Sequence, residues 1–347
     1  MLRTRSNRST LALQPRGQMK YETSLLLLVA CLCSGFFTSC TDNSVSGLDA
    51  SPWVQTSATG SYYSASCFAV STPDLFVGTG GSGVFFSSDN GVRWFELIDV
   101  EYRPQVVFDV VVKPNSAGGL DLFAATYQYG VLLWTNTGTG WNAGTGWNTV
   151  NTGLRATHYV FALAVSDTNL FASTDSGVFL STNNGTSWTE VTNGLTNTYV
   201  FDLFVSGANL FASTGDGLFL STDQGTTWTV VNGSANLFAT AFAVSPEGTN
   251  LFAGIDGGGI FLSTNNGTSW TEVNNGLTSL SVSDLAVSGA SLFAGTLDGG
   301  VFLSSNNGTS WTTVNSGLTN SNVQALTVSG TNLYAGVGDG SIWRHPL

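Results

Sequence analysis

The stretch Tyr199–Val231, YVFDLFVSGANLFASTGDGLFLSTDQGTTWTVV, sets the architecture of the chain. It divides into four segments of mainly β-branched, aromatic and aliphatic residues, at 199–206, 209–214, 217–222 and 227–231. Ser-Gly-Ala, Gly-Asp-Gly and Asp-Gln-Gly separate these segments and are typical of hairpin turns. The stretch therefore predicts a small antiparallel sheet of four strands, which needs neighbours on both faces to be stable.

The dipeptide Leu-Phe, once Leu-Tyr, recurs along the chain at a nearly constant interval. Its Leu positions are Leu75, Leu122, Leu170, Leu210, Leu251, Leu292 and Leu333, and the last five are 40 or 41 residues apart. A period near 40 residues built from short strands is typical of β-propellers. Helical repeats of similar length need a 3.6-residue apolar pattern, which this sequence lacks.

We expect an all-β, seven-bladed propeller of four-stranded antiparallel blades over residues 53–347. Six blades are complete, at about 66–98, 107–150, 159–191, 199–231, 239–273 and 282–314. The seventh, 323–347, has sequence for three strands only, and WVQTS at Trp53–Ser57 resembles the outer-strand sequence WTEV. We therefore expect this N-terminal strand to complete the last blade, which also removes an unpaired sheet edge.

A motif between the third and fourth strands carries a resemblance to a known family. Ser-x-Asp-x-Gly-x-x-Trp occurs in full twice, and three further copies have Asn in place of Asp. The copies are Ser87, Asp89, Gly91 and Trp94; Ser181, Asn183, Gly185 and Trp188; Ser221, Asp223, Gly225 and Trp228; Ser263, Asn265, Gly267 and Trp270; and Ser304, Asn306, Gly308 and Trp311. They resemble the Asp-box, or BNR, repeat of sialidase-like, photosystem II assembly factor-like and sortilin-like propellers. The second blade is degenerate and has two candidates, Trp141 and Trp147, of which Trp147 fits the strand register.

The residue types of this motif indicate a turn rather than a catalytic site. An Asp or Asn side chain is expected to accept hydrogen bonds from backbone N–H groups one or two residues ahead. Gly permits a positive φ, and the Trp ring covers the blade. None of these roles needs an ionised carboxylate, so the Asn in three copies favours a structural role.

The first 40 residues predict an export signal outside the propeller. Lys20 precedes the apolar run Leu25–Phe37, which is short for a membrane span, and Met19 is a second candidate start. Phe37-Thr38-Ser39-Cys40 resembles a bacterial lipobox, which implies a lipid on Cys40, a tether over 41–52 and a place at the outer membrane or cell surface. Two alternatives stay open: a lipobox ending at Cys31, and an ordinary signal peptide that leaves a secreted or periplasmic protein.

The chain beyond Cys40 is strongly acidic. Five Lys and Arg stand there against 21 Asp and Glu, which argues against nucleic acid or an anionic lipid surface as a partner. Cys67 is the only cysteine in that part of the sequence, so no disulfide framework is expected and a packed core must supply the stability. We expect a monomer that contacts the membrane only through its lipid.

Three aspartates are expected to approach the central channel. Alignment of the inner strands gives Cys67, Asp109, Ala162, Asp202, Ala241, Asp284 and Ala325 one equivalent position, and the turns after the second strands add Asp175, Asp216, Asp256, Asp298 and Asp339. Such an acidic face suits a cation such as Ca²⁺, or a cationic or polyhydroxyl ligand. The alternative is structural: Asp-Gly forms good hairpins, and the inner aspartates cap backbone N–H groups of adjacent blades.

The face opposite the Asp-boxes, where propellers of this family usually bind ligands, is also expected to carry aromatic and basic side chains. These are Tyr102, Arg103, Arg155, His158, Tyr159 and Tyr199. They would suit a carbohydrate or peptide groove, and they are equally compatible with ordinary loops.

The resemblance implies three candidate functions. A sialidase needs an arginine cluster, a Tyr–Glu pair and an acid Asp, but only four Arg follow Cys40 and Arg93 lies inside an Asp-box turn. We therefore name no catalytic residues and no firm cofactor, and favour a non-catalytic binding or scaffold propeller for glycan or protein. The alternatives are an exo-α-sialidase-type hydrolase and a multivalent lectin. A lectin predicts regular aromatic residues in the top loops, and Tyr102, Tyr159 and Tyr199 have no counterparts in blades 5 to 7.

Overall fold

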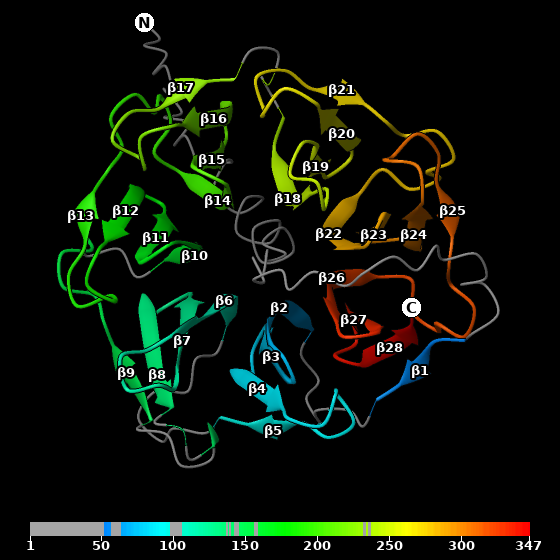
Figure 1. Cartoon of the computed structure of the whole chain (residues 1–347), viewed down its shortest axis with the longest axis horizontal. Helices are drawn as coiled ribbons and strands as arrows, with labels where there is room; N and C mark the ends of the chain where they lie inside the picture. The colour runs from blue at the N-terminus through cyan, green and yellow to red at the C-terminus, as the bar shows by residue number, and fades with distance from the viewer. Residues whose placement is uncertain are drawn as a thin grey trace, which may run out of the picture.

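A computed structural model describes residues 52–56, 64–97, 106–136, 138, 140–141, 146–155, 159–231, 234 and 237–347. They form seven antiparallel sheets of four strands each, arranged as blades around a central axis (Figure 1). Neighbouring inner strands contact one another all around the ring. The predicted all-β, seven-bladed propeller is therefore confirmed. Within these ranges no helix is long and apolar enough to cross a membrane.

The strands of a blade follow one another from the centre outwards. Blades 1 to 3 are β2 (Ala65–Ser71), β3 (Asp74–Thr79), β4 (Val84–Ser87) and β5 (Phe95–Glu96); β6 (Val107–Pro114), β7 (Leu120–Thr126), β8 (Val131–Asn136) and β9 (Trp147–Thr149); β10 (Val160–Ser166), β11 (Asn169–Thr174), β12 (Gly177–Ser181) and β13 (Thr189–Glu190). Blades 4 and 5 are β14 (Val200–Ser206), β15 (Asn209–Thr214), β16 (Gly217–Ser221) and β17 (Thr229–Val230); β18 (Ala239–Val244), β19 (Leu251–Ile255), β20 (Gly259–Ser263) and β21 (Thr271–Glu272). Blades 6 and 7 are β22 (Val282–Ser288), β23 (Ser291–Thr296), β24 (Gly300–Ser304) and β25 (Thr312–Thr313); β26 (Val323–Ser329), β27 (Asn332–Val337), β28 (Ile342–Pro346) and β1 (Val54–Gln55).

The N-terminal strand closes the ring as predicted, although it is shorter than the expected segment 53–57. β1 pairs antiparallel with β28, with Val54 opposite Arg344 (Figure 1). Trp53 just before it is 3% exposed, and its indole N–H donates to the carbonyl oxygen of Val314 in blade 6 at 2.6 Å. The last blade therefore takes one strand from the start of the fold and three from its end.

The Leu-Phe period follows from how the blades share their cores. In blade 3, Leu170 packs with Phe123 of blade 2, whereas its neighbour Phe171 packs with Leu203 of blade 4. Successive side chains of a strand point to opposite faces of the sheet. One dipeptide therefore packs into the interfaces on both sides of its blade, and we call each interface between neighbouring blades a seam. The second strand of each blade is therefore apolar at both residues of the dipeptide. The dipeptide recurs once per blade, so its spacing in the sequence equals the number of residues in a blade.

The turns of the five motifs that resemble the Asp-box, called Asp-box turns below, are held by three hydrogen bonds that recur in all five copies. In blade 3, the Ser181 hydroxyl donates to Asn183 Oδ1 at 3.0 Å and accepts from the Gly185 N–H at 2.8 Å. Asn183 Oδ1 also accepts from the Ser187 N–H at 2.9 Å, four residues ahead instead of the expected one or two. Both Asn184 and Gly185 have positive φ, of 60° and 78°.

The other four copies repeat these bonds, so the expected reach of one or two residues is wrong for them as well. The serine hydroxyl accepts at 2.7 to 2.9 Å from the N–H of Gly91, Gly225, Gly267 and Gly308. These glycines have φ between 74° and 83°. The bond from the N–H four residues ahead, at 2.8 to 2.9 Å, is accepted by Oδ1 of Asp89, Asp223, Asn265 and Asn306. Asp and Asn thus make the same backbone bond through the same oxygen.

Most motif tryptophans connect their blade to the one before it. The Trp228 indole N–H donates to the Val191 carbonyl of blade 3 at 2.7 Å. The corresponding bonds of Trp188 and Trp311 go to the carbonyls of Val150 and Val273. Each of these tryptophans packs into a seam, and the pairing of its outer strand starts only at the next residue. The outer strands are therefore shorter than predicted: β17 covers two residues of the expected 227–231.

Two motif tryptophans differ in their acceptors. The Trp94 indole N–H of blade 1 donates to a side chain, the Thr56 hydroxyl just after β1, at 3.3 Å. Because β1 belongs to blade 7, this bond still joins a blade to its predecessor and crosses the closure of the ring. The Trp270 indole N–H donates at 3.1 Å to the Gly267 carbonyl of its own turn instead. Trp270 therefore lacks the indole bond across a seam that the other four copies make.

Both tryptophans of the degenerate second blade lie in the seam with blade 1. Trp147 begins β9, as its register predicts, and its indole N–H donates to the Leu97 carbonyl at 3.2 Å. Trp141, in the connection before β9, packs edge-on against Phe76 at 4.5 Å and donates to Asp74. The second Trp therefore adds to the same seam.

Candidate functional site

Every inner strand carries a β-bulge near its start. The pairing register with the second strand shifts by one residue in all seven blades, between Ala65 and Cys67 in blade 1 and at the equivalent place in the others. The residues inside the shift are Ser66, Phe108, Phe161, Phe201, Thr240, Ser283 and Gln324. This end of the ring lies opposite the Asp-box turns, and we call it the top face. A bulge redirects a side chain, so these seven residues are natural determinants of that face.

The residues after the bulge occupy the equivalent position that the inner-strand alignment predicts. Asp109, Asp202 and Asp284 each pair with a small residue of the second strand, namely Ala125, Ser213 and Gly295. All three aspartates are buried, with 0%, 5% and 2% exposure. The structure therefore places them inside the inner wall of the ring, on alternate blades.

Two of these aspartates bind the backbone of the next blade. Asp109 Oδ2 accepts from the Leu163 N–H at 2.7 Å, and Asp284 Oδ2 accepts from the Leu326 N–H at 2.6 Å. Asp284 Oδ1 also accepts from the Leu285 N–H at 2.7 Å. Asp202 Oδ1 accepts from the N–H of its own neighbour Leu203, at 2.8 Å, and its Oδ2 is buried without a hydrogen-bond partner among the described residues.

Burial controls the ionisation of the inner aspartates. Loss of solvent raises the pKa of Asp202 well above its ordinary value, and the nearby Asp109 carboxylate raises it further. Burial also raises the pKa of Asp284, although its two backbone N–H donors oppose that effect. Both carboxyls therefore favour the protonated form over a wider pH range than an exposed aspartate does.

The inner aspartates do not make a ligand set for a metal ion. Across the part of the chain that the structure describes, no group of three or more His, Cys, Asp or Glu side chains is arranged to hold one. Oδ2 of Asp109 and Oδ2 of Asp284 are each engaged with the backbone of the next blade. This geometry gives the expected Ca²⁺ site no support.

The turn aspartates lie at the rim of the top face. Asp175, Asp216, Asp256, Asp298 and Asp339 follow the second strands of blades 3 to 7 in order. Several are fixed locally: Asp216 accepts from Thr196 Oγ1 at 2.8 Å, Asp298 accepts from Ser279, and Asp339 Oδ1 accepts from the Ser341 N–H at 2.9 Å. Partial burial acts to raise the pKa of Asp339, but the hydrogen bonds that it accepts outweigh burial and hold the pKa below its ordinary value. The rim therefore carries a carboxyl group on each of five successive blades.

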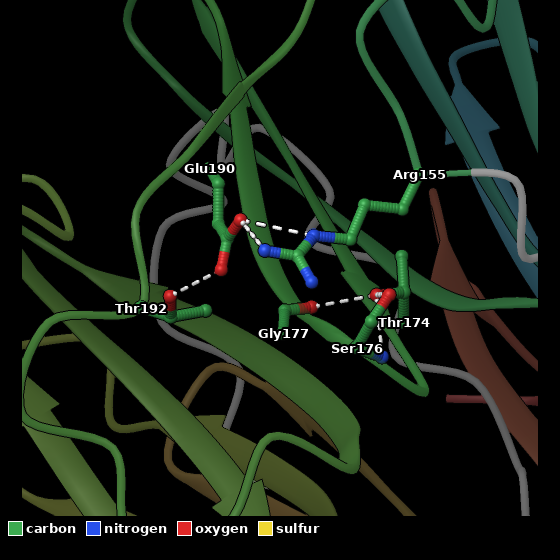
Figure 2. A network of polar contacts seen from close by, with 6 residues as sticks. All are labelled: Arg155, Thr174, Ser176, Gly177, Glu190 and Thr192. Atoms are coloured by element: carbon green, nitrogen blue, oxygen red, sulfur yellow. Dashed lines mark hydrogen bonds and ion pairs between the residues drawn. The ribbon is translucent and has the colours of Figure 1, made fainter.

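Of the basic residues expected on this face, only Arg155 lies within the described residues, and its side chain is engaged in an ion pair. Arg155 binds Glu190 of β13 with Nε and Nη2, at 3.1 and 2.7 Å, and Thr192 donates to the other Glu190 oxygen (Figure 2). The Thr192 bond, with Arg155, holds the pKa of Glu190 below its ordinary value. Tyr102, Arg103 and His158 lie outside the described residues.

Seven aromatic side chains, of which Phe108 and Phe161 are buried and five are partly exposed, form a continuous set at the top end of the ring, which we call the aromatic arc. They are Phe108, Tyr127, Tyr159, Phe161, Tyr199, Phe201 and Phe238, from blades 2 to 5. Ring centroids are 4.7 Å apart for Tyr127 and Tyr159, 5.1 Å for Phe161 and Tyr199, and 4.2 Å for Phe201 and Phe238. The Phe108 ring joins Tyr127 to Phe161, with ring centroids 6.1 Å from Tyr127 and 5.6 Å from Phe161. Tyr159 and Tyr199, predicted as site residues, both belong to it.

The rest of the ring is polar at the same positions. The bulge residues Ser66, Thr240 and Ser283 donate from their hydroxyls to Val107, Val282 and Val323 of the next blade, at 2.6, 2.7 and 2.7 Å. Those hydroxyls satisfy a backbone carbonyl across each seam, whereas Phe108, Phe161 and Phe201 contribute ring contacts. The top face is thus divided into an aromatic part and a polar part.

Five members of the aromatic arc were not predicted from the sequence: Phe108, Tyr127, Phe161, Phe201 and Phe238. One signal was present, because the residue before the aligned Asp or Ala position is Phe in three successive blades. Without the bulge, alternation would point that residue into a seam. The bulge therefore sets the direction of these three rings, of which Phe201 is partly exposed whereas Phe108 and Phe161 are buried.

Comparison with solved structures shows what this chain resembles in fold. No protein-family model matches the sequence, and no curated protein matches it. The extracellular domain of the putative one component system BT4673 from B. thetaiotaomicron has a TM-score of 0.65 at 17% identity, covering 85% of this chain. The aligned region is 40% of that domain's chain, so this chain spans less than half of its length.

Two YCF48 structures match over nearly their whole length. YCF48 bound to D1 peptide has a TM-score of 0.67 at 16% identity, covering 88% of this chain and 100% of that one. YCF48 from Cyanidioschyzon merolae has a TM-score of 0.64 at 15% identity, covering 85% and 98%. At such identities the similarity establishes a common propeller fold.

Proposed function

We propose that this chain is a non-catalytic binding module that holds a segment of another protein on its top face. The aromatic arc carries this proposal. Tyr127, Tyr159, Tyr199, Phe201 and Phe238 are partly exposed, although they are large and mutually packed. Partly exposed aromatic clusters are common at protein interfaces, because each ring gives a large contact area at a small entropy cost.

The structural neighbours support a protein partner. One of them, YCF48, is bound to D1 peptide, and another is the extracellular domain of a putative one component system. Glycan is the second candidate, because the same partly exposed rings offer flat apolar faces. It is less favoured, because the aromatic positions are confined to blades 2 to 5 and do not give one site per blade.

Hydrolysis of the sialidase type has no specific support. The three described arginines lie on different blades, with Arg93 bound to Asp89 in an Asp-box turn and Arg155 bound to Glu190. Arg344 lies on β28, opposite Val54 of the closing strand. A carboxylate-binding cluster of the kind a sialidase needs would require side chains that these blades hold apart.

Photo-crosslinking in intact cells tests the proposed function. A benzophenone amino acid replaces Tyr199 in the aromatic arc or, as the control, Thr226 in an exposed Asp-box turn at the opposite end. We expect a defined protein adduct from position 199 that position 226 does not give. Equal adducts from both positions, or a glycan adduct alone, would refute binding of a protein segment on this face.

We further propose that the module is exported and held at a bacterial surface by a lipid on Cys40. The apolar run 25–37 and the residues before Cys40 support this proposal, and both lie outside the described residues. Radiolabelled palmitate should enter the wild-type protein and not Cys40→Ser. Labelling that persists in Cys40→Ser and disappears in Cys31→Ser would move the anchor to the alternative lipobox.

A further inference from the structure

We propose that the occupant of the aromatic arc is an extended protein segment in which Lys or Arg alternates with apolar side chains. This inference rests on the proposed function and names the chemistry of its partner. The apolar side chains would lie on the rings of blades 3 to 5, and the cations would face Asp175, Asp216 and Asp256 at the rim.

Each of these three blades pairs one ring with one carboxylate. Tyr159 immediately precedes Val160, and Asp175 immediately follows Thr174, the pairing partner of Val160. Phe238 and Asp256 flank the pair Ala239–Ile255 in the same way. In blade 4 the Asn197 side chain connects the two groups, accepting from the Tyr199 N–H at 2.9 Å and donating to Asp216 at 3.3 Å.

The pairing does not extend around the ring. Blades 6 and 7 have rim aspartates as well, Asp298 and Asp339, but the residue before their inner strands is Ser281 or Asn322. Rim aspartates therefore occur on all of blades 3 to 7, but only those of blades 3 to 5 lie next to an aromatic ring. A partner that needs both chemistries would be located on those three blades.

Charge complementarity selects a cationic partner. No Lys or Arg occurs between Arg155 and Arg344, so the sequence of blades 3 to 6 offers its rim aspartates no lysine or arginine side chain. Arg155 itself is engaged by Glu190. Cations are attracted both by carboxylates and by the faces of aromatic rings, so one Lys or Arg beside each ring satisfies both groups.

One rim oxygen lacks a donor at the edge of this region. Asp175 Oδ1 is buried and has no hydrogen-bond partner among the described residues. A buried acceptor without a donor is costly, and a cation bound at the rim beside Asp175 would stabilise this carboxylate by charge complementarity. A neutral or anionic segment would leave this oxygen as it is.

Defined peptides provide the test. The purified protein is titrated with fluorescent peptides of about 12 residues, long enough to cross three blades at roughly 3.3 Å per residue. The sequences alternate Leu with Lys, Leu with Glu, or Ser with Lys, and binding is followed by polarisation in about 0.15 M salt, which screens distant charges. We expect the Leu-Lys peptide to bind at least about tenfold more tightly than either of the others.

Matched variants separate this site from general attraction to an acidic protein. Asp216→Asn removes a carboxylate beside a ring, and Asp298→Asn removes one from blade 6 that has no ring beside it. Tyr199→Ser introduces the residue type that blade 6 has at this position, Ser281. We expect Asp216→Asn to weaken Leu-Lys binding roughly fivefold and Tyr199→Ser about tenfold, with Asp298→Asn unchanged. Melting curves of all three variants confirm that each is folded.

Failure of this inference can be distinguished from failure of the proposed function. Equal binding of the Leu-Lys and Ser-Lys peptides, or equal effects of Asp216→Asn and Asp298→Asn, would overturn the inference. If crosslinking at position 199 still gives a protein adduct, the proposed function stands and only the chemistry of the partner is wrong. If the peptides and the crosslinking both fail, the proposed function fails as well.

Discussion

Asp202→Asn and Asp284→Asn form a matched pair that separates charge burial from hydrogen bonding in the inner wall. Both carboxyls are buried, but Asp202 accepts one backbone N–H whereas Asp284 accepts two. Asn is uncharged and keeps one acceptor oxygen. We expect Asp202→Asn to be at least as stable as the wild type at neutral pH. Asp284→Asn should be less stable than Asp202→Asn by about 1–3 kcal/mol, because one buried N–H loses its acceptor.

The pH dependence gives the sign of the charge effect. Below the ordinary aspartate pKa of 3.8, both the folded and the unfolded protein hold the proton on residue 202. As the pH rises above that value, the unfolded state releases the proton while folded Asp202 keeps it until its raised pKa is reached. The free energy of unfolding therefore falls by up to about 1.4 kcal/mol per pH unit in this window. Asp202→Asn removes this contribution, so its advantage over the wild type grows with pH.

Calorimetric melting between about pH 4 and pH 8 measures both effects. A difference of about 2 kcal/mol corresponds to roughly 3 °C in Tm for a propeller of about 300 residues, whose unfolding entropy is about 0.6 kcal/mol/K. The reasoning is refuted if Asp202→Asn melts below Asp284→Asn at neutral pH. It is equally refuted if the difference between Asp202→Asn and the wild type does not change with pH.

Three further predictions concern the seams of the ring and the turns that contain the Trp motif. Trp228→Phe should cost about 1 kcal/mol more in urea unfolding than Trp270→Phe, because only Trp228 bonds to the preceding blade; equal costs would contradict this. Asn183→Asp should change the unfolding midpoint little, since the equivalent Asp223 accepts the same backbone N–H; a large loss would assign the amide a specific role. Trp53→Ala should lower stability by about 3–5 kcal/mol in thermal melts, and an unchanged Tm would argue against closure through this ring.

Much of the fold could be predicted from the sequence because the repeat and the packing have the same period. Leu170 and Phe171 face different seams, so the apolar dipeptide had to recur once per blade. The missing strand of blade 7 pointed to a partner near Trp53. The lengths of the outer strands were wrong, because a preference for β structure does not show that Trp228 enters a seam before pairing starts.

The candidate site was predicted less completely, for a physical reason. Its members come from a turn, from the residues before inner strands and from the bulge, as Tyr127, Tyr159 and Phe161 illustrate. No single spacing in the sequence connects those positions. The position of a bulge depends on pairing between two strands, so the direction of Phe161 is fixed only in the assembled sheet.

Ring closure also determines how the fold would bear force. The chain upstream of Trp53 enters through β1, so a pull from that side acts first on two residue pairs with β28 and on one indole ring. Trp53 is bonded to blade 6 while β1 is bonded to blade 7, and a load arriving there is divided between two blades. Detachment of β1 would expose the edge of β28 and leave a ring that is open at one known position. A pull from the N-terminal side would therefore load one of the shortest strands of the propeller first, at the point where any membrane tether would be attached.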